Sequence, residues 1–80
     1  MPTVFIHEQY RFYFFSREEV RRHIHVSSSD GEAKIWLEPE IAVARIVNLS
    51  VQEVNEILEI VKKRQEEINA FWNKHFGENK

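Results

Sequence analysis

Hydrophobic residues recur at steps of three and four along the last third of the chain, from Ser50 to Gly77. This spacing places them along one side of a helix and predicts a single long amphipathic helix. Ser50-Val51-Gln52-Glu53 fits a capping box at its beginning, and Gly77 fits the residue that ends it. Such a helix is roughly 40 Å long, at about 1.5 Å per residue. We therefore expect the aromatic residues near its end to extend beyond a small sheet and to need another partner. These residues are Phe71, Trp72 and Phe76.

The residues before this helix have the alternation of short strands. Two runs rich in aromatic and β-branched residues, Thr3–His7 and Tyr10–Phe15, predict a hairpin around Glu8-Gln9. The pairs expected from this turn are Phe5 with Phe12 and Thr3 with Phe14. Both faces of the hairpin are partly apolar, so we expect one to pack against the helix and the other to form an interface. Residues 16–22 follow as a charged connection, interpreted as a solvated loop or a short helix.

A second hairpin gives the clearest pattern in the chain. Asp30-Gly31 separates two alternating runs, His23–Ser29 and Glu32–Leu37, and this dipeptide is typical of two-residue hairpin turns. The pairs expected on the core face are Val26 with Ile35 and Ile24 with Leu37. The pairs expected on the opposite face are His25 with Trp36, Ser27 with Lys34 and His23 with Glu38. Pro39 ends the strand, and the β-branched run Ile41–Val47 predicts a fifth one.

Together these elements predict an α+β fold. We expect a four- to five-stranded, mainly antiparallel sheet, two hairpins plus a further strand, covered on one face by one long C-terminal helix. Residues 1–80 contain no repeat, linker or low-complexity tract, which indicates a single small domain. Because the chain has no cysteine, neither disulfides nor thiolate metal sites add stability, and oligomerisation is the remaining source.

The composition narrows the classes of function. Lys and Arg number 11 and Asp and Glu number 13, so the formal net charge of −2 does not indicate a nucleic-acid or anionic-membrane ligand. No apolar run approaches the roughly 18 residues needed to cross a bilayer, and the N-terminus lacks the pattern of a signal peptide. We therefore expect a cytoplasmic protein with no membrane association.

The side chains most suited to chemistry gather on one face of the second hairpin: His23, His25, Lys34, Trp36 and Glu38. Two histidines two residues apart point to the same side of a strand, so with Glu38 they form a ligand set suited to Zn or Fe(II). A lone His-x-His pattern is a weak signal, however, and His25 stacked on Trp36 is an ordinary structural pair. We predict no cofactor, and His23, His25 and Glu38 stay as metal candidates.

Two further interpretations involve RNA or DNA. Histidines transfer protons near neutral pH, and Lys34, Arg45 and the Arg21/Arg22 pair are suited to hold phosphate during acid–base chemistry on RNA. The candidate catalytic residues are His23, His25, Lys34, Glu38 and Arg45. Nucleic-acid binding without catalysis would use Trp36 or Tyr13 to stack on bases and arginines to hold phosphates, and the balanced charge argues against it. The residues alone leave open whether the chain is an enzyme.

Several motifs resemble a known family, the small bacterial proteins grouped as domain-of-unknown-function family 4160. The similar segments are Met1-Pro2-Thr3-Val4-Phe5, Tyr10-Arg11-Phe12-Tyr13-Phe14, His23-Ile24-His25-Val26 and Glu32-Ala33-Lys34-Ile35-Trp36-Leu37-Glu38-Pro39. The resemblance continues through the helix with its late Trp72 and covers nearly the whole chain. Family members usually have prolines before the histidine pair, where this chain has Arg21 and Arg22.

The resemblance also implies a partner. Members are often encoded beside a second small protein, and such pairs are suspected toxin–antitoxin-like modules; no established activity comes with the resemblance. With the apolar first hairpin and the aromatic helix end, it favours a protein-interaction module that binds a partner encoded nearby or a second copy of itself. The alternative is an RNA-acting toxin or a nucleic-acid-binding protein that uses the face with His23, His25, Lys34 and Trp36.

Overall fold

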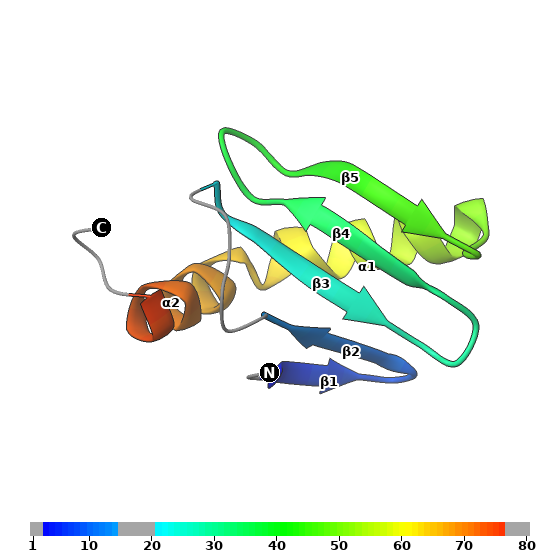
Figure 1. Ribbon diagram of the computed structural model, residues 1–80, viewed down its shortest axis with the longest axis horizontal. Helices are drawn as coiled ribbons and strands as arrows, with labels where there is room; N and C mark the ends of the chain where they lie inside the picture. The colour runs from blue at the N-terminus through cyan, green and yellow to red at the C-terminus, as the bar shows by residue number, and fades with distance from the viewer. Residues whose placement is uncertain (1–2, 15–20, 77–80) are drawn as a thin grey trace.

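Five antiparallel strands lie side by side in chain order, and two helices follow them (Figure 1). The computed structural model describes residues 3–14 and 21–76. The strands are β1 Thr3–His7, β2 Tyr10–Tyr13, β3 His23–Ser27, β4 Glu32–Trp36 and β5 Ala42–Val47; the helices are α1 Val51–Lys63 and α2 Gln65–Phe76. The predicted α+β class and antiparallel sheet are confirmed, whereas the single long helix is wrong. The predictions for residues 15–20 and for Gly77 lie outside the described residues.

The first helix begins where the capping box predicted. The Ser50 N–H donates to the Glu53 carboxylate at 2.8 Å, and the Glu53 N–H donates to Ser50 Oγ at 3.1 Å. A helix start leaves its first N–H groups without partners inside the helix, and the Glu53 N–H is one of these. This local sequence pattern therefore fixes where the helical part of the chain starts.

The helical run is interrupted at Arg64, which caps α1 with φ −109° and ψ 24°. Its guanidinium donates to both carboxylate oxygens of Glu67, at 2.9 and 3.0 Å. The Cζ atom of Arg64 also lies 3.6 Å from the centre of the Phe5 ring. The side chain at the break is thus held by α2 and by β1 together. Hydrophobic periodicity marks this place only by the polar Gln65, because the contact with Phe5 joins distant parts of the chain.

The break changes where the aromatic end of the helical run lies. Trp72 of α2 meets Phe14 edge-on, with ring centres 5.1 Å apart, and Phe71 lies 5.9 Å from the same ring. Trp72 is only 6% exposed. The expected overhang is therefore wrong for these two residues, because α2 is a separate helix that packs on the sheet. The Phe76 side chain lies outside the description.

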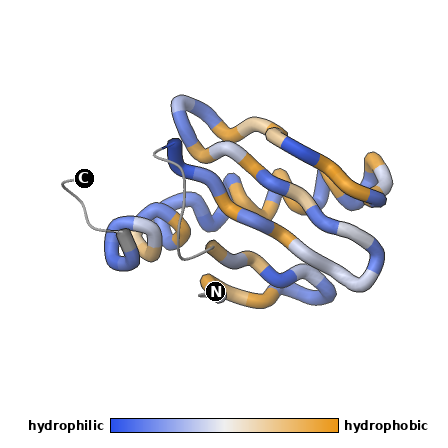
Figure 2. Tube along the Cα trace, viewed as in Figure 1, coloured by the Kyte–Doolittle hydropathy of each residue, from blue (hydrophilic) through white to orange (hydrophobic). Residues whose placement is uncertain are grey.

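Among the described residues, the buried hydrophobic side chains other than Tyr13 form one cluster that joins strands and helices. Its members are Tyr10, Phe12, Phe14, Ile24, Val26, Ala33, Ile35, Leu37, Ile57, Val61, Ile68 and Trp72. Figure 1 places α1 behind the sheet, and Figure 2 shows hydrophobic and hydrophilic positions alternating along the strands. We call the side of the sheet turned away from this cluster the outer face. No helix in residues 3–14 and 21–76 is long and apolar enough to span a membrane.

The second hairpin has a different register from the predicted one but the same faces. Residues 28–31 form a four-residue loop, closed by a hydrogen bond from Ser28 N to Gly31 O at 2.9 Å. Ile24 consequently pairs with Ile35, and every predicted pair shifts by two residues. The predicted two-residue turn is wrong. Because strand side chains alternate with a period of two, a shift of two leaves each side chain on its predicted face.

The first hairpin follows its predicted register over only part of its length. Phe5 pairs with Phe12, and their rings are stacked with centres 4.6 Å apart. Thr3 pairs with Tyr13 instead of Phe14, because a register shift lies between Thr3 and Phe5. The bulge absorbs one residue of β1, which the sequence pattern did not indicate.

Gly31 holds the β3–β4 loop against the end of β5, because a Cβ at this position would overlap the Val47 carbonyl oxygen and lie 2.6 Å from that of Asn48. We expect Gly31→Ala to lower the free energy of unfolding by about 1–3 kcal/mol, since the loop or β5 must move to make room. Chemical denaturation tests this, with Ser29→Ala in the same exposed loop as the control. Equal stability of the two variants would contradict the prediction.

Candidate functional site

A row of side chains crosses the outer face from strand to strand. Tyr13 on β2 lies opposite His25 on β3, His25 lies opposite Lys34 on β4, and Lys34 lies opposite Arg45 on β5. Directly paired residues share one face of a sheet. Their neighbours along the strands, by contrast, belong to the buried cluster: Phe12, Val26 and Ile35. We call Tyr13, His25, Lys34 and Arg45 the outer row. Three of the predicted site residues are thus brought together from three strands.

Members of the outer row differ in exposure. Tyr13 is buried, His25 and Lys34 are half-buried, and Arg45 is exposed. The Tyr13 ring stacks near His25 with centres 5.5 Å apart, and the Cζ of Arg11 lies 4.8 Å from the centre of the same ring. Lys34 and Arg45 therefore form the accessible part of the row, whereas Tyr13 and the Nε2 atom of His25 are buried.

Trp36 lies next to the outer row, two residues after Lys34 on β4, and is half-buried. The Nζ of Lys34 is 4.6 Å from the centre of its ring, and the Cζ of Arg21 is 4.0 Å from it. Arg21 is exposed, and its Nε donates to the Glu38 carbonyl oxygen at 2.8 Å. Each cation over an exposed aromatic ring gains about 0.5–1 kcal/mol. Trp36 therefore holds two positive charges at the surface.

The two predicted histidines have different surroundings. His23 is 1% exposed, its ring lies edge-on to Trp36, and its Nδ1 is 2.8 Å from the Arg21 carbonyl oxygen. A carbonyl only accepts, so Nδ1 is the nitrogen that carries the hydrogen. His25 is half-buried and pairs with Lys34. The predicted pairing of His25 with Trp36 is wrong, because the four-residue loop places His23 opposite Trp36.

Glu38 takes part in the chain's own hydrogen bonding. Its Oε2 accepts from the Arg22 N–H at 3.1 Å. The predicted pairing of Glu38 with His23 is replaced by that of Trp36 with His23. Within residues 3–14 and 21–76, no three His, Cys, Asp or Glu side chains are grouped to hold a metal ion. The structure therefore brings the His23 and His25 rings together, with centres 5.0 Å apart, without completing a ligand set.

A hollow of about 40 Å³ opens on the outer face beside the outer row. It is lined by His25, Glu32, Ala33, Lys34 and Arg45. Two basic side chains and an imidazole border it, against one carboxylate. Small-molecule pockets measure about 300–1,000 Å³, so this hollow admits only a group of a few atoms. Its lining suits a compact anionic group better than a neutral organic ligand.

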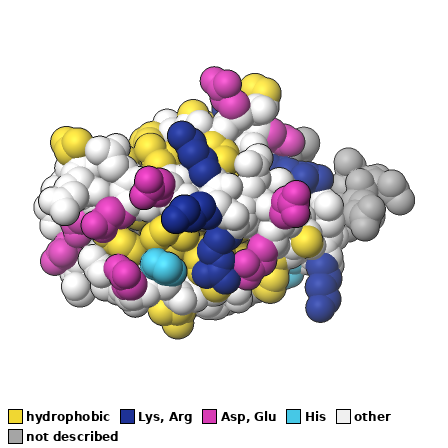
Figure 3. Space-filling view, turned by 180° about the vertical axis from the view of Figure 1, so that it is seen from behind, with side chains coloured by type: hydrophobic (Ala, Val, Ile, Leu, Met, Phe, Trp, Pro, Cys, Tyr) yellow, Lys and Arg dark blue, Asp and Glu magenta, His cyan; other side chains and the backbone are white. Residues whose placement is uncertain are grey.

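Positive and negative charges are unequally divided between the two sides of the molecule. The charged residues of the five strands are Arg11, Lys34, Arg45 and Glu32. The charged residues of the two helices include five glutamates; they are Glu53, Glu56, Glu59, Glu66, Glu67, Lys62, Lys63 and Lys74. Figure 3, seen from the helix side, shows acidic side chains spread around that surface and a group of basic ones in its middle. The strands thus carry three basic side chains against one acidic one, although the net charge of the whole chain is −2.

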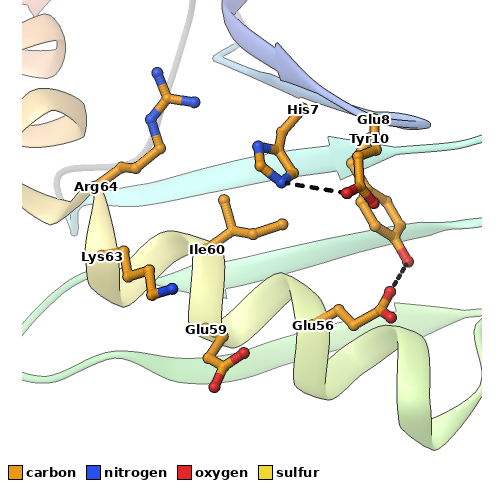
Figure 4. Close-up of a pocket in the computed structure, with 8 residues that line it drawn as sticks. All are labelled: His7, Glu8, Tyr10, Glu56, Glu59, Ile60, Lys63 and Arg64. Atoms are coloured by element: carbon orange, nitrogen blue, oxygen red, sulfur yellow. Dashed lines mark hydrogen bonds and ion pairs between the residues drawn. The ribbon is translucent and has the colours of Figure 1, made fainter.

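A separate cleft of about 230 Å³ lies between the β1–β2 turn and α1 (Figure 4). Its lining is His7, Glu8, Tyr10, Glu56, Glu59, Ile60, Lys63 and Arg64. The Tyr10 hydroxyl donates to Glu56 Oε1 at 2.9 Å, and His7 Nε2 lies 3.9 Å from Glu8 Oε2. Sequence reasoning missed this cleft, because Tyr10 and Glu56 are 46 residues apart and no motif links them. Acidic and basic groups are mixed in it, so it favours no charge class of ligand.

Fold and site together define a small α+β domain with one hydrophobic cluster and a basic, partly aromatic outer face. A family model described as "Domain of unknown function (DUF4160)" matches residues 10–73. The chain belongs to this family, which confirms the resemblance seen in its motifs. The match begins with β2 and reaches into α2, so it includes the whole outer row. Neither the curated proteins nor the solved structures gave a match.

Burial, then the hydrogen bond and the negative charge of Glu56, raise the pKa of Tyr10 to about 12. An unfolded tyrosine has a pKa of about 10. The protonated phenol is thus favoured by folding, and its contribution to stability is complete below pH 10 and lost as the pH rises toward 12. We expect Glu56→Gln to lower the pKa of Tyr10, because the charged acceptor is removed. Phenolate absorbance measured during alkaline titration tests this.

The matched controls for this titration are single tyrosine variants. Tyr10→Phe should abolish the transition near pH 12, and Tyr13→Phe should leave it in place. A transition in Glu56→Gln at the same pH as in the unaltered protein would show that the carboxylate does not act on this phenol.

Proposed function

We propose that the protein binds nucleic acid through the outer face of its sheet. The observation that carries this proposal is the arrangement of His25, Lys34 and Arg45 in one cross-strand row beside Trp36. Basic side chains neutralise phosphates, and aromatic or guanidinium planes stack on bases; proteins that bind single strands combine the two. Both kinds of group lie on one face here, within contact distance of each other at Lys34 and Trp36.

The negative net charge is compatible with this proposal because of the molecule's shape. Its shortest dimension is 20 Å, and Figure 1 is viewed along that axis, with the sheet in front of α1. Charges on opposite faces are screened with a Debye length of about 8 Å at physiological ionic strength. A phosphate at the outer face therefore interacts mainly with the charges of that face, attracted by Arg11, Lys34 and Arg45 and repelled by Glu32, and only weakly with the helix glutamates. The charge of the face, not of the whole chain, governs the contact.

The structure favours binding over cleavage as the activity of this face. Acid–base cleavage of RNA needs proton-transferring groups within reach of the substrate. His23 is 1% exposed, and its Nδ1 is engaged with the Arg21 carbonyl oxygen at 2.8 Å. Of the predicted histidine pair only His25 is partly exposed, and its Nε2 atom is buried. The candidates Lys34, Arg45 and His25 are therefore proposed as binding residues, and His23 as a residue that positions the neighbouring Arg21 and Trp36.

Reversing charge on the outer face should abolish binding. We expect Lys34→Glu with Arg45→Glu to lower the affinity for a labelled single-stranded RNA by more than about tenfold, because both phosphate-facing charges are inverted. The slope of log affinity against log salt should also become shallower by about 0.7 for each phosphate that the variant no longer neutralises. Fluorescence anisotropy between 50 and 200 mM salt provides both readouts.

The matched control is Lys62→Glu with Lys74→Glu, which makes the same change of charge at two exposed positions on the helices. Its affinity should stay close to that of the unaltered protein. If both double variants lose binding equally, the interaction depends on overall charge and the outer face is not the site. Circular dichroism establishes that each variant keeps its fold.

A second candidate function, binding to a protein partner, is favoured by a different observation. Val43, Val47 and Val51 are 41%, 37% and 78% exposed, and β5 is an end strand of the sheet, with one side unpaired among the residues that the structure describes. Such an edge accepts a further strand from another chain. This is where we place the partner that the resemblance implies, whether the product of a neighbouring gene in a toxin–antitoxin-like pair or a second copy.

Substituting the exposed valines tests this second candidate. Val43→Lys with Val47→Lys should dissociate a homodimer, or a complex with the co-expressed neighbouring gene product, because lysines block pairing at a strand edge. Light scattering coupled to size-exclusion chromatography measures the change. If the unaltered protein is monomeric and does not bind the product of the neighbouring gene, this function is excluded. The proposal of nucleic-acid binding would not be affected by that result.

A further inference from the structure

We propose that the outer face selects single-stranded nucleic acid, with an unpaired base on the Arg21–Trp36 stack and the adjoining phosphate in the hollow beside His25, Lys34 and Arg45. This inference rests on the proposed function and specifies the form of its ligand. The inference is argued from two neighbouring subsites of different chemistry. One offers a flat surface for a base, and the other offers positive charge for a phosphate.

The base subsite consists of the Arg21 guanidinium and the Trp36 ring over which it lies. The Cζ of Arg21 lies 4.0 Å from the centre of the Trp36 ring, and Arg21 is exposed. A guanidinium stacked on an indole offers its other face to solvent, where a base can stack in turn. The buried His23 contacts both residues of this subsite. Its ring lies edge-on to Trp36, and its Nδ1 is 2.8 Å from the Arg21 carbonyl oxygen. The plane is therefore fixed before any ligand arrives.

The phosphate subsite is the hollow of about 40 Å³ lined by His25, Lys34 and Arg45 together with Glu32 and Ala33. Its size excludes a base and admits the oxygens of one phosphate. Lys34 connects the two subsites, because it lines the hollow while its Nζ lies 4.6 Å from the centre of the Trp36 ring. Residues two apart on a strand are separated by about 6.6 Å. A base and the phosphate next to it are close enough to reach both subsites at once.

Glu32 limits the site on the side away from Trp36. It pairs with Ser27 on β3 and Val47 on β5, in the row after the outer row, and its carboxylate borders the hollow. A second phosphate beyond the first would meet this negative charge. The face therefore fits a short stretch of strand and not a long regular track of phosphates.

Duplexes satisfy only half of this arrangement. Their bases are stacked inside the helix and offer no free face to the Arg21–Trp36 stack, so only the phosphate subsite is used. Stacking of one base on an aromatic side chain accounts for about a tenfold or greater effect on affinity in single-strand-binding proteins. We therefore expect single-stranded RNA to bind at least about tenfold more tightly than the duplex of the same sequence.

The test compares a labelled ten-nucleotide RNA with the matching duplex by fluorescence anisotropy. Trp36→Leu should bring single-strand affinity down to the level of the duplex, and Trp36→Tyr should retain the preference because it keeps an aromatic plane. Arg21→Gln, at an exposed position, should weaken single-strand binding in the same direction without risk to the fold. Single strands should also quench tryptophan emission through Trp36, since Trp72 is only 6% exposed.

A further variant tests whether a phosphate occupies the hollow. Glu32→Gln should raise affinity for both forms by a factor of about two to five, because one repulsive charge beside the hollow is removed. Lower affinity in this variant would mean that no phosphate occupies the hollow.

The outcomes separate this inference from the function on which it rests. One outcome is equal affinity for single strand and duplex, with unchanged affinity in Trp36→Leu and Arg21→Gln and lost binding in Lys34→Glu with Arg45→Glu. This outcome overturns single-strand selection and keeps nucleic-acid binding. No binding of either form at 50 mM salt overturns both. Single-strand preference that disappears in Trp36→Leu and persists in Trp36→Tyr supports the two-subsite arrangement.

Discussion

The packing of α2 against the end of the sheet is the constraint on which the rest of the structure depends. Trp72 meets Phe14 with ring centres 5.1 Å apart and lies 5.7 Å from the ring of His23. Without the break at Arg64, a straight helix would carry Trp72 past the sheet, and the hydrophobic cluster would lose a large side chain. A domain of 80 residues has few such side chains to spare. The contacts of Arg64 with Phe5 and Glu67 lie at this break and join α2 to β1.

The sequence pattern predicted which face each strand residue occupies more reliably than which residue it pairs with. His25 and Lys34 reached the expected outer face although their predicted partners were wrong, because alternation depends on position along one strand and survives a shift of two. The loop of residues 28–31, by contrast, is closed by the Ser28-to-Gly31 bond, and Asp30-Gly31 alone gave no sign of the longer loop. The helix start was predictable because the Ser50–Glu53 box is local. Other features join segments that are distant in the sequence, so a periodic pattern of residues could not predict them. They are the helix break, the Tyr10–Glu56 hydrogen bond and the contact of Arg21 with Trp36.

Arg21 and Arg22 occupy the positions before the histidine pair where members of the similar family usually have prolines. Both arginines make contacts that a proline could not make. The Arg22 guanidinium donates to Asn73 Oδ1 at 2.7 Å and so ties the start of β3 to α2. Its N–H donates to the Glu38 carboxylate, and its carbonyl oxygen accepts from the Leu37 N–H at 2.9 Å. Proline has neither the side-chain donors nor the N–H. Arg22 therefore helps to hold α2 in this chain, and Arg21 supplies the cation over Trp36.

His23 connects the buried side of the molecule to the outer face. Its ring lies 5.7 Å from that of Trp72, within the packing of α2, and 5.6 Å from that of Trp36, on the outer face. Its Nδ1 also fixes the Arg21 backbone through a 2.8 Å contact with the carbonyl oxygen. A side chain that is 1% exposed cannot meet a ligand, yet its position determines where Trp36 and Arg21 stand. The two histidines thus have different roles. His25 borders the hollow, while His23 links the packing of the core to the position of the residues on the face that we assign to binding.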